Sequence, residues 1–251
     1  LLTGKTTIKA RRSIKENLEN GTTSILIGTH ALFQEAVIFK DLGYVIIDEQ
    51  HRFGVQQRLE LIAKATHPDV LVMTATPIPR SLTLTMFGDM SVSQIKDKPK
   101  NRLPIVTTIT SNNRWQQVSL SLQKIIDQGQ KIYWVCPLID QKDKTLEHDD
   151  NFAYADVTKC SLELSKIYPG QVAVIHGKMK STEKESVMQN FKDGIIKILV
   201  ATTVIEVGID VPDATLIIVE NAEKFGLAQL HQLRGRVGRG ELQSYCILMY
   251  E

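Results

Sequence analysis

Val45-Ile46-Ile47-Asp48-Glu49-Gln50-His51 is the stretch that decides the fold of this chain. Three branched apolar residues end directly in two adjacent carboxylates. This pattern is typical of a buried parallel strand that delivers acids to the carboxyl edge of an α/β sheet, where ligands bind. One acid can help to hold Mg²⁺ through its water shell, and the next can orient the water that attacks a phosphate. Asp48 and Glu49 are therefore candidate catalytic and metal-binding residues.

A second stretch offers the opposite charge, and it reads Gln232-Leu233-Arg234-Gly235-Arg236-Val237-Gly238-Arg239. Guanidinium groups spaced by glycines suit an arginine finger, which stabilises charge on a transferred phosphoryl group. Alone, an aspartate at a strand end is common, and an Arg/Gly cluster is more often a solvated turn or an anion patch. Together, acids in one half and arginines in the other predict a nucleotide between two domains.

Composition sets the class of protein. The chain has 251 residues, with 43% hydrophobic and 23% charged residues, as in a soluble globular protein large enough for two domains. No apolar run approaches the ~20 residues that cross a bilayer, and no secretory signal is visible, so we expect a cytoplasmic protein without membrane contact. The net charge of +2 does not by itself predict nucleic-acid binding. Because the chain opens at Leu1 without methionine, we expect an excised fragment.

The cysteines and histidines are scattered along the sequence. Cys136, Cys160 and Cys246 are odd in number and far apart, so their spacing predicts neither a disulfide framework nor a zinc site. We expect reduced thiols. The six histidines are spread equally widely, which makes a histidine metal cluster improbable.

Apolar β-rich runs alternate with amphipathic stretches, which predicts an α/β fold with parallel sheets and helical crossovers. The polar stretch from Lys96 to Pro104 predicts a connection between two domains, residues 1–97 and 98–251. The predicted strands are Ser24–Gly28, Tyr44–Asp48, Val70–Thr74, Lys131–Val135, Gln171–His176, Lys197–Ala201, Thr215–Val219 and Tyr245–Met249. The predicted helices include Thr6–Leu18, Arg114–Asp127 and Thr182–Phe191.

Two further strand-end segments carry hydroxyl side chains. Thr74-Ala75-Thr76 can bond to the neighbouring carboxylates, although an ordinary turn with Thr76 as a helix cap fits equally well. The segment Ala201–Asp210 can place threonines on nucleic-acid phosphates and Gly208 and Asp210 near a nucleotide sugar. It too can be a plain strand-to-helix junction.

Taken together, these segments resemble superfamily 2 helicases. Asp48-Glu49-Gln50-His51 is similar to their Walker B or DEAD/DEAH box, Thr74–Thr76 to motif III, Ala201–Asp210 to motif V and Gln232–Arg239 to motif VI. Finer features resemble the RecG family of bacterial ATP-dependent branch-migration helicases. They are Ile27–Leu32, Asp48–Arg58, Tyr133–Ile139 and Lys224–Arg236. The runner-up is a translocase of the transcription-repair coupling factor type, which is similar through Ala75–Arg80 and motif VI.

The resemblance implies two RecA-like domains, the first truncated at its N-terminus, in a helicase that uses ATP and Mg²⁺ to remodel stalled forks and Holliday junctions. It implies Asp48, Glu49, Arg236 and Arg239 as catalytic residues. The implied nucleotide-binding residues are Gln50, His51, Gly208, Asp210 and Gln232. The implied nucleic-acid-binding residues are Gly4, Thr29, His30, Thr202 and Thr203, and the implied coupling residues are Thr74 and Thr76. The partners it implies are branched or duplex DNA and a single-stranded DNA-binding protein, with the chain as a monomer.

One element of the family is missing from the sequence. A P-loop requires G-x-x-x-x-G-K-[ST] after a strand, so that backbone amides and a lysine hold the phosphates. Gly4-Lys5-Thr6 matches only the end of that pattern, and the resemblance places Leu1–Gly4 in motif Ia, a DNA-backbone element. We therefore expect the P-loop and the family's wedge domain to lie outside this chain. Alone, the chain is expected to be an inert nucleic-acid-binding module.

Overall fold

The apolar run Val45–Ile47 lies in strand β1 (Tyr44–Ile47) of the computed structural model, as predicted. The structure describes residues 1–50, 53–74, 91–95, 97, 99, 101–137, 155–202 and 210–251. The chain divides into two compact units, residues 1–88 and 89–251. This division lies upstream of the predicted connection, and the assignment of domains to 1–97 and 98–251 stays a prediction. Among the described residues, no helix is long and apolar enough to cross a membrane.

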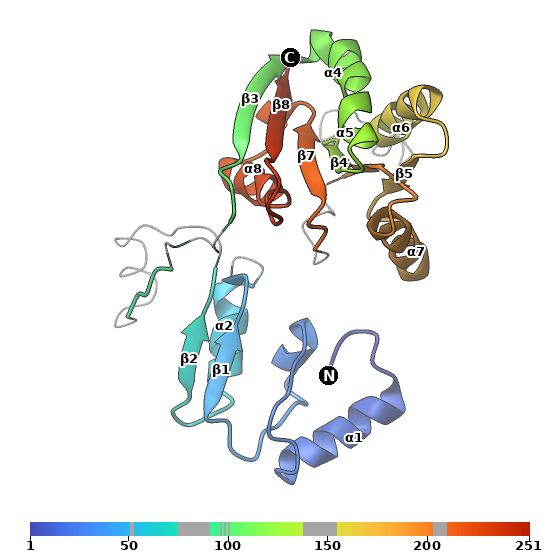
Figure 1. Cartoon of the computed structure of the whole chain (residues 1–251). Coiled ribbons are helices and arrows are strands. Elements are labelled where there is room, and N and C mark those ends of the chain that lie inside the picture. The colour runs from blue at the N-terminus through green and yellow to red at the C-terminus, as the bar shows by residue number, and fades with distance from the viewer. Residues whose placement is uncertain are drawn as a thin grey trace, which may run out of the picture. The chain divides into compact units, whose positions relative to one another are not determined.

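In the first unit, β1 pairs in parallel with β2 (Asp69–Val72), and α2 (Val55–Ile62) connects them (Figure 1). The prediction of a buried strand is wrong for half of β1. Val45 and Ile47 are buried against Leu61 of α2, whereas Ile46 on the opposite face is 56% exposed. The reason is that α2 covers only one face of a two-stranded ladder, so alternate side chains differ in burial.

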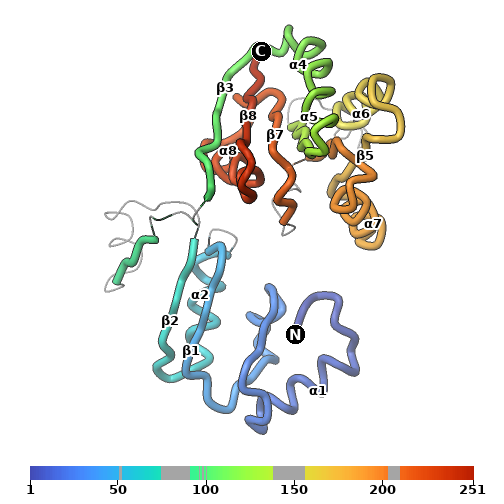
Figure 2. Tube along the Cα trace, viewed as in Figure 1, coloured from blue at the N-terminus to red at the C-terminus, as the bar shows by residue number. Residues whose placement is uncertain are grey.

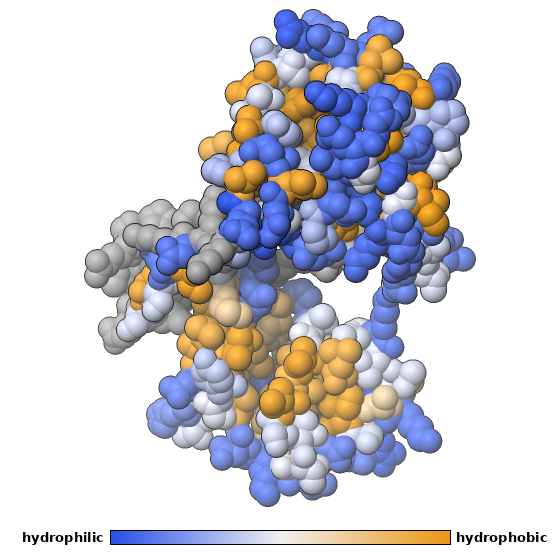
Figure 3. Space-filling view, viewed as in Figure 1, coloured by the Kyte–Doolittle hydropathy of each residue, from blue (hydrophilic) through white to orange (hydrophobic). Residues whose placement is uncertain are grey.

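A second small core of the first unit joins segments near its N-terminus. Helix α1 (Ile8–Glu19) begins at Thr7, whose hydroxyl accepts a hydrogen bond from Ala10 N, and it buries Leu18. The short 3₁₀ helix η1 (His30–Phe33) contributes Ala31 to the same core. The strand predicted at Ser24–Gly28 is wrong, because only Gly28 pairs, in an isolated bridge with Leu2. Large apolar side chains of this unit are exposed, and apolar patches show on its surface (Figure 3).

The second unit contains a six-stranded parallel sheet in the order β3-β8-β7-β4-β6-β5. β3 and β8, the first and last of these strands along the chain, lie side by side, which the chain trace shows (Figure 2). The strands are β3 (Val106–Ser111), β4 (Lys131–Val135), β5 (Val172–Ile175), β6 (Ile198–Ala201), β7 (Ala214–Val219) and β8 (Tyr245–Tyr250). The five strands predicted here are confirmed to within a residue at each end, and β3 was not predicted.

Helices cover both faces of this sheet. Tyr133 and Val135 of β4 point to a core closed by α7 and α8, whereas Ile132 and Trp134 point to a core closed by α4, α5 and α6. This alternation is the period of two that a strand buried on both faces requires. The helices are α4 (Trp115–Ser121), α5 (Gln123–Asp127), α6 (Ala155–Ile167), α7 (Ser181–Lys192) and α8 (Leu227–Arg234), and the short 3₁₀ turns are η3 (Asn112–Arg114) and η6 (Ala222–Lys224).

The predicted helix Arg114–Asp127 is divided into α4 and α5 at Leu122. The hydroxyls of Ser119 and Ser121 each donate to a backbone carbonyl three residues earlier. Side chains that bond to the local backbone compete with the helical ladder, which accounts for the break.

Candidate active site

The two adjacent acids stand where β1 ends. Asp48 Oδ1 accepts a hydrogen bond of 2.8 Å from the backbone N–H of Glu49. Glu49 has a φ of 49°, in the left-handed region that a residue with a side chain rarely adopts. The chain therefore turns sharply after Asp48. This turn leaves the Asp48 side chain exposed and the Glu49 side chain half-buried, so the two carboxylates differ in their access to water.

Gln50 fixes the loop that follows the acids. Its backbone N–H donates to the carbonyl of Met73, just past β2, and its side-chain Oε1 accepts from Arg58 Nη1 at 3.1 Å. Both side chains are buried. The loop is thus tied to the segment that leads into Thr74, which is half-buried. Sequence reasoning missed Arg58, although it lies three residues before Leu61 on the buried face of α2.

Two of the predicted DNA-contact segments lie together in the first unit. Leu2 N–H donates to Ile27 O at 2.8 Å, and Thr29 N–H donates to Leu2 O at 3.3 Å. A side chain on Gly28 would lie 2.3 Å from Leu2 O, so only glycine permits this approach. The bridge brings Gly4 and Thr29, both exposed, onto neighbouring segments.

His30 is exposed and packs among aromatic rings. Its ring centroid lies 4.9 Å from that of Phe53 and 6.0 Å from that of Phe33, and the two phenylalanines contact each other edge to face. This packing gives His30 a structural role, and a contact with nucleic acid stays a prediction. His51 and Thr76, which were predicted for nucleotide binding and coupling, lie outside the described residues.

In the second unit, Thr202 follows β6 directly. Its side chain is fully buried, and its Oγ1 has no hydrogen-bond partner among the residues that the structure describes. The described residues thus place this hydroxyl inside the unit, and its contact with DNA stays a prediction. Thr203 and Gly208 lie outside the described residues.

The glycine-rich segment after α8 brings Arg239 to Asp210. Arg239 Nη1 lies 3.3 Å from Asp210 Oδ1, and Arg239 Nε donates to the carbonyl of Gly235. Two glycines make this path possible. Gly238 has a φ of 72°, and a Cβ on it would lie 2.8 Å from Ile105; a Cβ on Gly240 would lie 2.6 Å from Pro212 O.

The positive charges of the two candidate catalytic arginines both influence the pKa of the buried Tyr133 hydroxyl. Burial raises the pKa of Tyr133 to about 12, while the positive charges of Arg239 and Arg236 oppose that shift. Both guanidinium groups therefore lie within electrostatic reach of one point near β4. Arg236 and Gln232 are half-buried. Within the second unit, a pocket of about 310 Å³ lies beside this segment and is lined by Arg102, Leu103, Ile105, Gly235, Val237, Gly238 and Arg239.

Comparisons with known proteins identify both halves of the chain. Residues 1–85 match the family "DEAD/DEAH box helicase", and residues 118–241 match "Helicase conserved C-terminal domain". The chain is 49% identical to the ATP-dependent DNA helicase RecG of a Synechocystis species over 99% of its own length and 29% of that protein. It is 49% identical to the same helicase of Acidithiobacillus ferridurans, of which it covers 36%. The chain thus spans about a third of the length of these relatives.

Solved structures agree with these matches. A RecG bound to a three-way DNA junction shares 43% identity with a TM-score of 0.70, over 99% of this chain and 31% of that one. The Mycobacterium smegmatis helicase Lhr, bound to single-stranded DNA and AMP-PNP, shares 18% identity with a TM-score of 0.69, over 99% of this chain and 34% of that one. The second likeness shows the fold alone. The predicted fold class, two RecA-like units with parallel sheets, is confirmed.

Proposed function

This chain belongs to the RecG family of DNA helicases, and we propose that it forms the ATP-hydrolysing and DNA-translocating part of a helicase. The protein would remodel branched DNA, such as stalled forks and Holliday junctions, in recombination and repair. One observation carries the proposal: near-half identity to RecG proteins extends over almost the whole chain. The runner-up, a translocase of the transcription-repair coupling factor type, is not favoured by these relatives.

Asp48 and Glu49 have the chemistry that ATP hydrolysis with Mg²⁺ needs. Oxygen ligands suit this hard cation, which keeps several of its waters, and an exposed carboxylate at a strand end leaves room for them. Asp48 therefore serves the ion. The half-buried carboxylate of Glu49 is the proton acceptor that orients the attacking water. The backbone N–H of Glu49, bonded to Asp48, keeps the two acids in a fixed local order.

Arg236 and Arg239 supply positive charge to the phosphoryl group during hydrolysis. Their charge is needed most in the transition state, where negative charge spreads over the transferred group. Asp210 orients Arg239 through their ion pair. Nucleotide contacts are further proposed for Gln50, His51, Gly208, Asp210 and Gln232.

Contacts to the DNA backbone fix position without reading sequence. The bridged segments around Gly4 and Thr29 support such a surface, because they expose small residues and backbone next to each other. His30, Thr202 and Thr203 complete the proposed DNA contacts. Thr74 and Thr76 are the proposed coupling residues, and the bond from Gln50 to Met73 supports this by linking the acids to that segment.

The phosphate cradle is absent from the sequence, since no G-x-x-x-x-G-K-[ST] occurs in its 251 residues. The residues present therefore fit the hydrolytic half of an ATP site and not the half that holds the phosphates. A cytoplasmic location, a monomeric state and a single-stranded DNA-binding protein as partner belong to the same proposal and rest on family resemblance.

Steady-state ATPase measurements on the full-length protein test the proposal. A three-way junction should stimulate hydrolysis more than linear duplex of equal length, and Glu49→Gln should abolish the stimulation. Absence of hydrolysis with and without DNA would contradict it and favour a nucleic-acid-binding module without turnover.

A further inference from the structure

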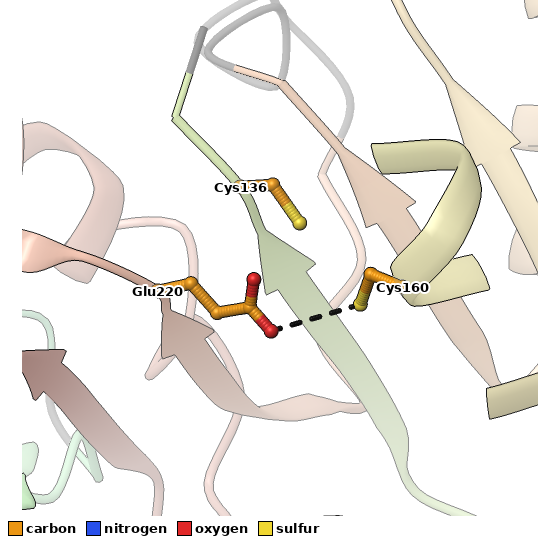
Figure 4. Close-up of side chains that lie close together, drawn as sticks. All are labelled: Cys136, Cys160 and Glu220. Atoms are coloured by element: carbon orange, nitrogen blue, oxygen red, sulfur yellow. Dashed lines mark hydrogen bonds between the residues drawn. The ribbon is translucent and has the colours of Figure 1, made fainter. Parts of the chain in front are cut away.

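Two cysteines and a glutamate that are distant in sequence come together in the second unit. The sulfur atoms of Cys136 and Cys160 and a carboxylate oxygen of Glu220 all lie within 4.8 Å of one another (Figure 4). Sequence spacing predicted neither a disulfide nor a zinc site, and it gave no sign that the first two cysteines are neighbours. Cys246 lies elsewhere, in β8.

The topology of the sheet accounts for this meeting. β4 and β7 are adjacent parallel strands with Val135 opposite Val219, so Cys136 and Glu220 follow at the same carboxyl edge. Glu220 N–H also donates to Val135 O at 2.9 Å. Cys160 comes from α6, which packs on that face of the sheet, and both cysteines belong to one apolar core.

We propose that Cys136, Cys160 and Glu220 form a binding site for a thiophilic divalent cation, of the zinc and cadmium type. Thiolate pairs select such ions, and a carboxylate is an accepted third ligand of zinc. With metal–sulfur bonds of ~2.3 Å, ligand atoms around a tetrahedral ion lie roughly 3.8 Å apart. The present separations therefore need to close by no more than about 1 Å, which is within reach of side-chain rotation.

Glu220 is held in the orientation that the site needs. Its Oε1 accepts hydrogen bonds of 2.7 Å from the indole N–H groups of both Trp115 and Trp134, and one of 3.7 Å from Cys160 Sγ. The indoles anchor one oxygen, and the second oxygen points toward Cys136 (Figure 4). Such an anchored carboxylate is typical of the outer support that fixes a metal ligand.

Charge and burial are consistent with a closed, structural type of site. Cys136 is 0% and Cys160 5% exposed. A hydrogen bond with Cys136, together with burial, raises the pKa of Cys160. A bound cation would replace the thiol protons, so that two metal–sulfur bonds form while two protons pass to water. The net charge of the cluster is unchanged by this exchange, because the two positive charges of the ion replace the two protons.

Asp156 of α6 is the candidate for a fourth ligand, and its carboxylate lies outside the group of atoms within 4.8 Å of one another. Asp156 lies one turn before Cys160, at the i, i+4 spacing that places two side chains on one face of a helix. Either Asp156 or a water would complete a tetrahedral set.

The tryptophans beside Glu220 can report metal binding through their fluorescence. Trp115 and Trp134 are the only two tryptophans of the chain, and both contact Glu220. Cadmium titration of the purified full chain, under reducing conditions, should produce the ultraviolet charge-transfer band of cadmium–thiolate bonds and change tryptophan fluorescence at one equivalent. Zinc should compete for the site, and Mg²⁺, a hard cation, should not.

Single variants assign the ligands. Cys136→Ser and Cys160→Ser should each weaken cadmium binding by roughly 100-fold or more, above the ~10–100-fold typical of losing an outer partner. Cys246→Ser, a buried cysteine outside the cluster, should bind as the wild type does. Glu220→Gln keeps an acceptor for the indoles and removes the charge, so binding should weaken while circular dichroism stays unchanged.

Three outcomes would overturn the proposal. They are the absence of a thiolate band in the wild type, a band that persists when both cysteines are replaced, and a band that depends on Cys246. If a serine variant fails to fold, the wild-type comparison of cadmium with Mg²⁺ still decides. A fluorescence response to both ions or to neither means that the cluster is only a hydrogen-bonded network.

Discussion

Arg239 and Asp210 form an ion pair, with Nη1 and Oδ1 3.3 Å apart, although both were predicted to face the nucleotide. The pair is partly exposed, with 31% and 62% of the two side chains accessible to solvent, so it contributes little to stability by itself. The ion pair instead fixes the direction of the Arg239 guanidinium group, which lies in a glycine-rich turn.

Arg239→Ala in the full-length protein should reduce the ATPase turnover number by ~10³-fold or more, because an arginine finger acts chiefly in the transition state. DNA affinity at fixed salt should change little. Steady-state ATPase rates and the affinity for forked DNA are measured across a salt series. The same measurements are made for Arg236→Ala. Arg12→Ala is the matched control, since that arginine pairs only with Glu16 on the exposed face of α1 among the interactions described. Near-normal turnover with weakened, less salt-dependent DNA binding would place these arginines on DNA phosphates.

Asp210→Asn tests the pairing itself. The amide retains a hydrogen-bond acceptor and loses the charge, so Arg239 should be less well oriented and turnover should fall, by less than in Arg239→Ala. Turnover measured for the double variant checks the coupling. If the two losses simply add, Asp210 acts independently of Arg239.

Glu49→Gln keeps the shape of the side chain and removes the proposed proton acceptor. Turnover should fall by ~10²–10⁴-fold, the range for general-base catalysis, while nucleotide affinity stays near the wild-type value. Single-turnover hydrolysis and equilibrium ATP binding separate the two quantities. A variant that loses affinity yet hydrolyses normally would show that Glu49 has a binding role.

The 251-residue chain alone should bind ATP weakly and hydrolyse it negligibly, because its sequence contains no complete P-loop. Isothermal titration calorimetry and an ATPase assay with forked DNA provide the measurement. Micromolar affinity with DNA-stimulated turnover would contradict the prediction and would make Lys5 a candidate for the phosphate-binding lysine.

Gly238→Ala should destabilise the second unit more than Gly129→Ala does. Both glycines have a positive φ, 72° and 76°, so both variants carry the same backbone strain. Only at position 238 would the new Cβ meet a neighbour, Ile105 at 2.8 Å. Overpacking of this kind costs ~1–3 kcal/mol. Urea unfolding followed by the fluorescence of the tryptophans gives the difference, and equal midpoints would disprove the close packing.

The strands of the second unit were predictable because their burial is almost complete. β4, β6 and β7 are buried along their whole length, so each appears in the sequence as a mainly apolar run, with Lys131 at the start of β4 and Thr215 in β7 as the exceptions. β3 was missed because Val-Thr-Thr-Ile-Thr-Ser lies at the sheet edge with mostly exposed side chains, and an exposed strand carries little hydrophobic signal.

The sequence singles out candidate site residues, but it does not predict how they are arranged. Asp48 and Arg239 stand out by their sequence context. The partner of Arg239, however, is Asp210, and that contact depends on how Gly238 and Gly240 pack against Ile105 and Pro212. Sequence patterns report local periodicity, whereas such contacts between distant segments are set by tertiary packing. The proximity of Cys136 and Cys160 was not predicted either, because it too depends on tertiary packing.

The position of β8 between β3 and β7 constrains how the second unit can be made by the ribosome. β3 is the first of the described strands of this unit to be synthesised, and among them it pairs only with β8, which comprises residues 245–250. The nascent chain can join β4, β5, β6 and β7 earlier, but within the described part of the chain β3 has no partner strand until β8 has been synthesised. Completion of the sheet therefore waits for the synthesis of residues 245–250, and a non-local pairing of this kind is slow to form.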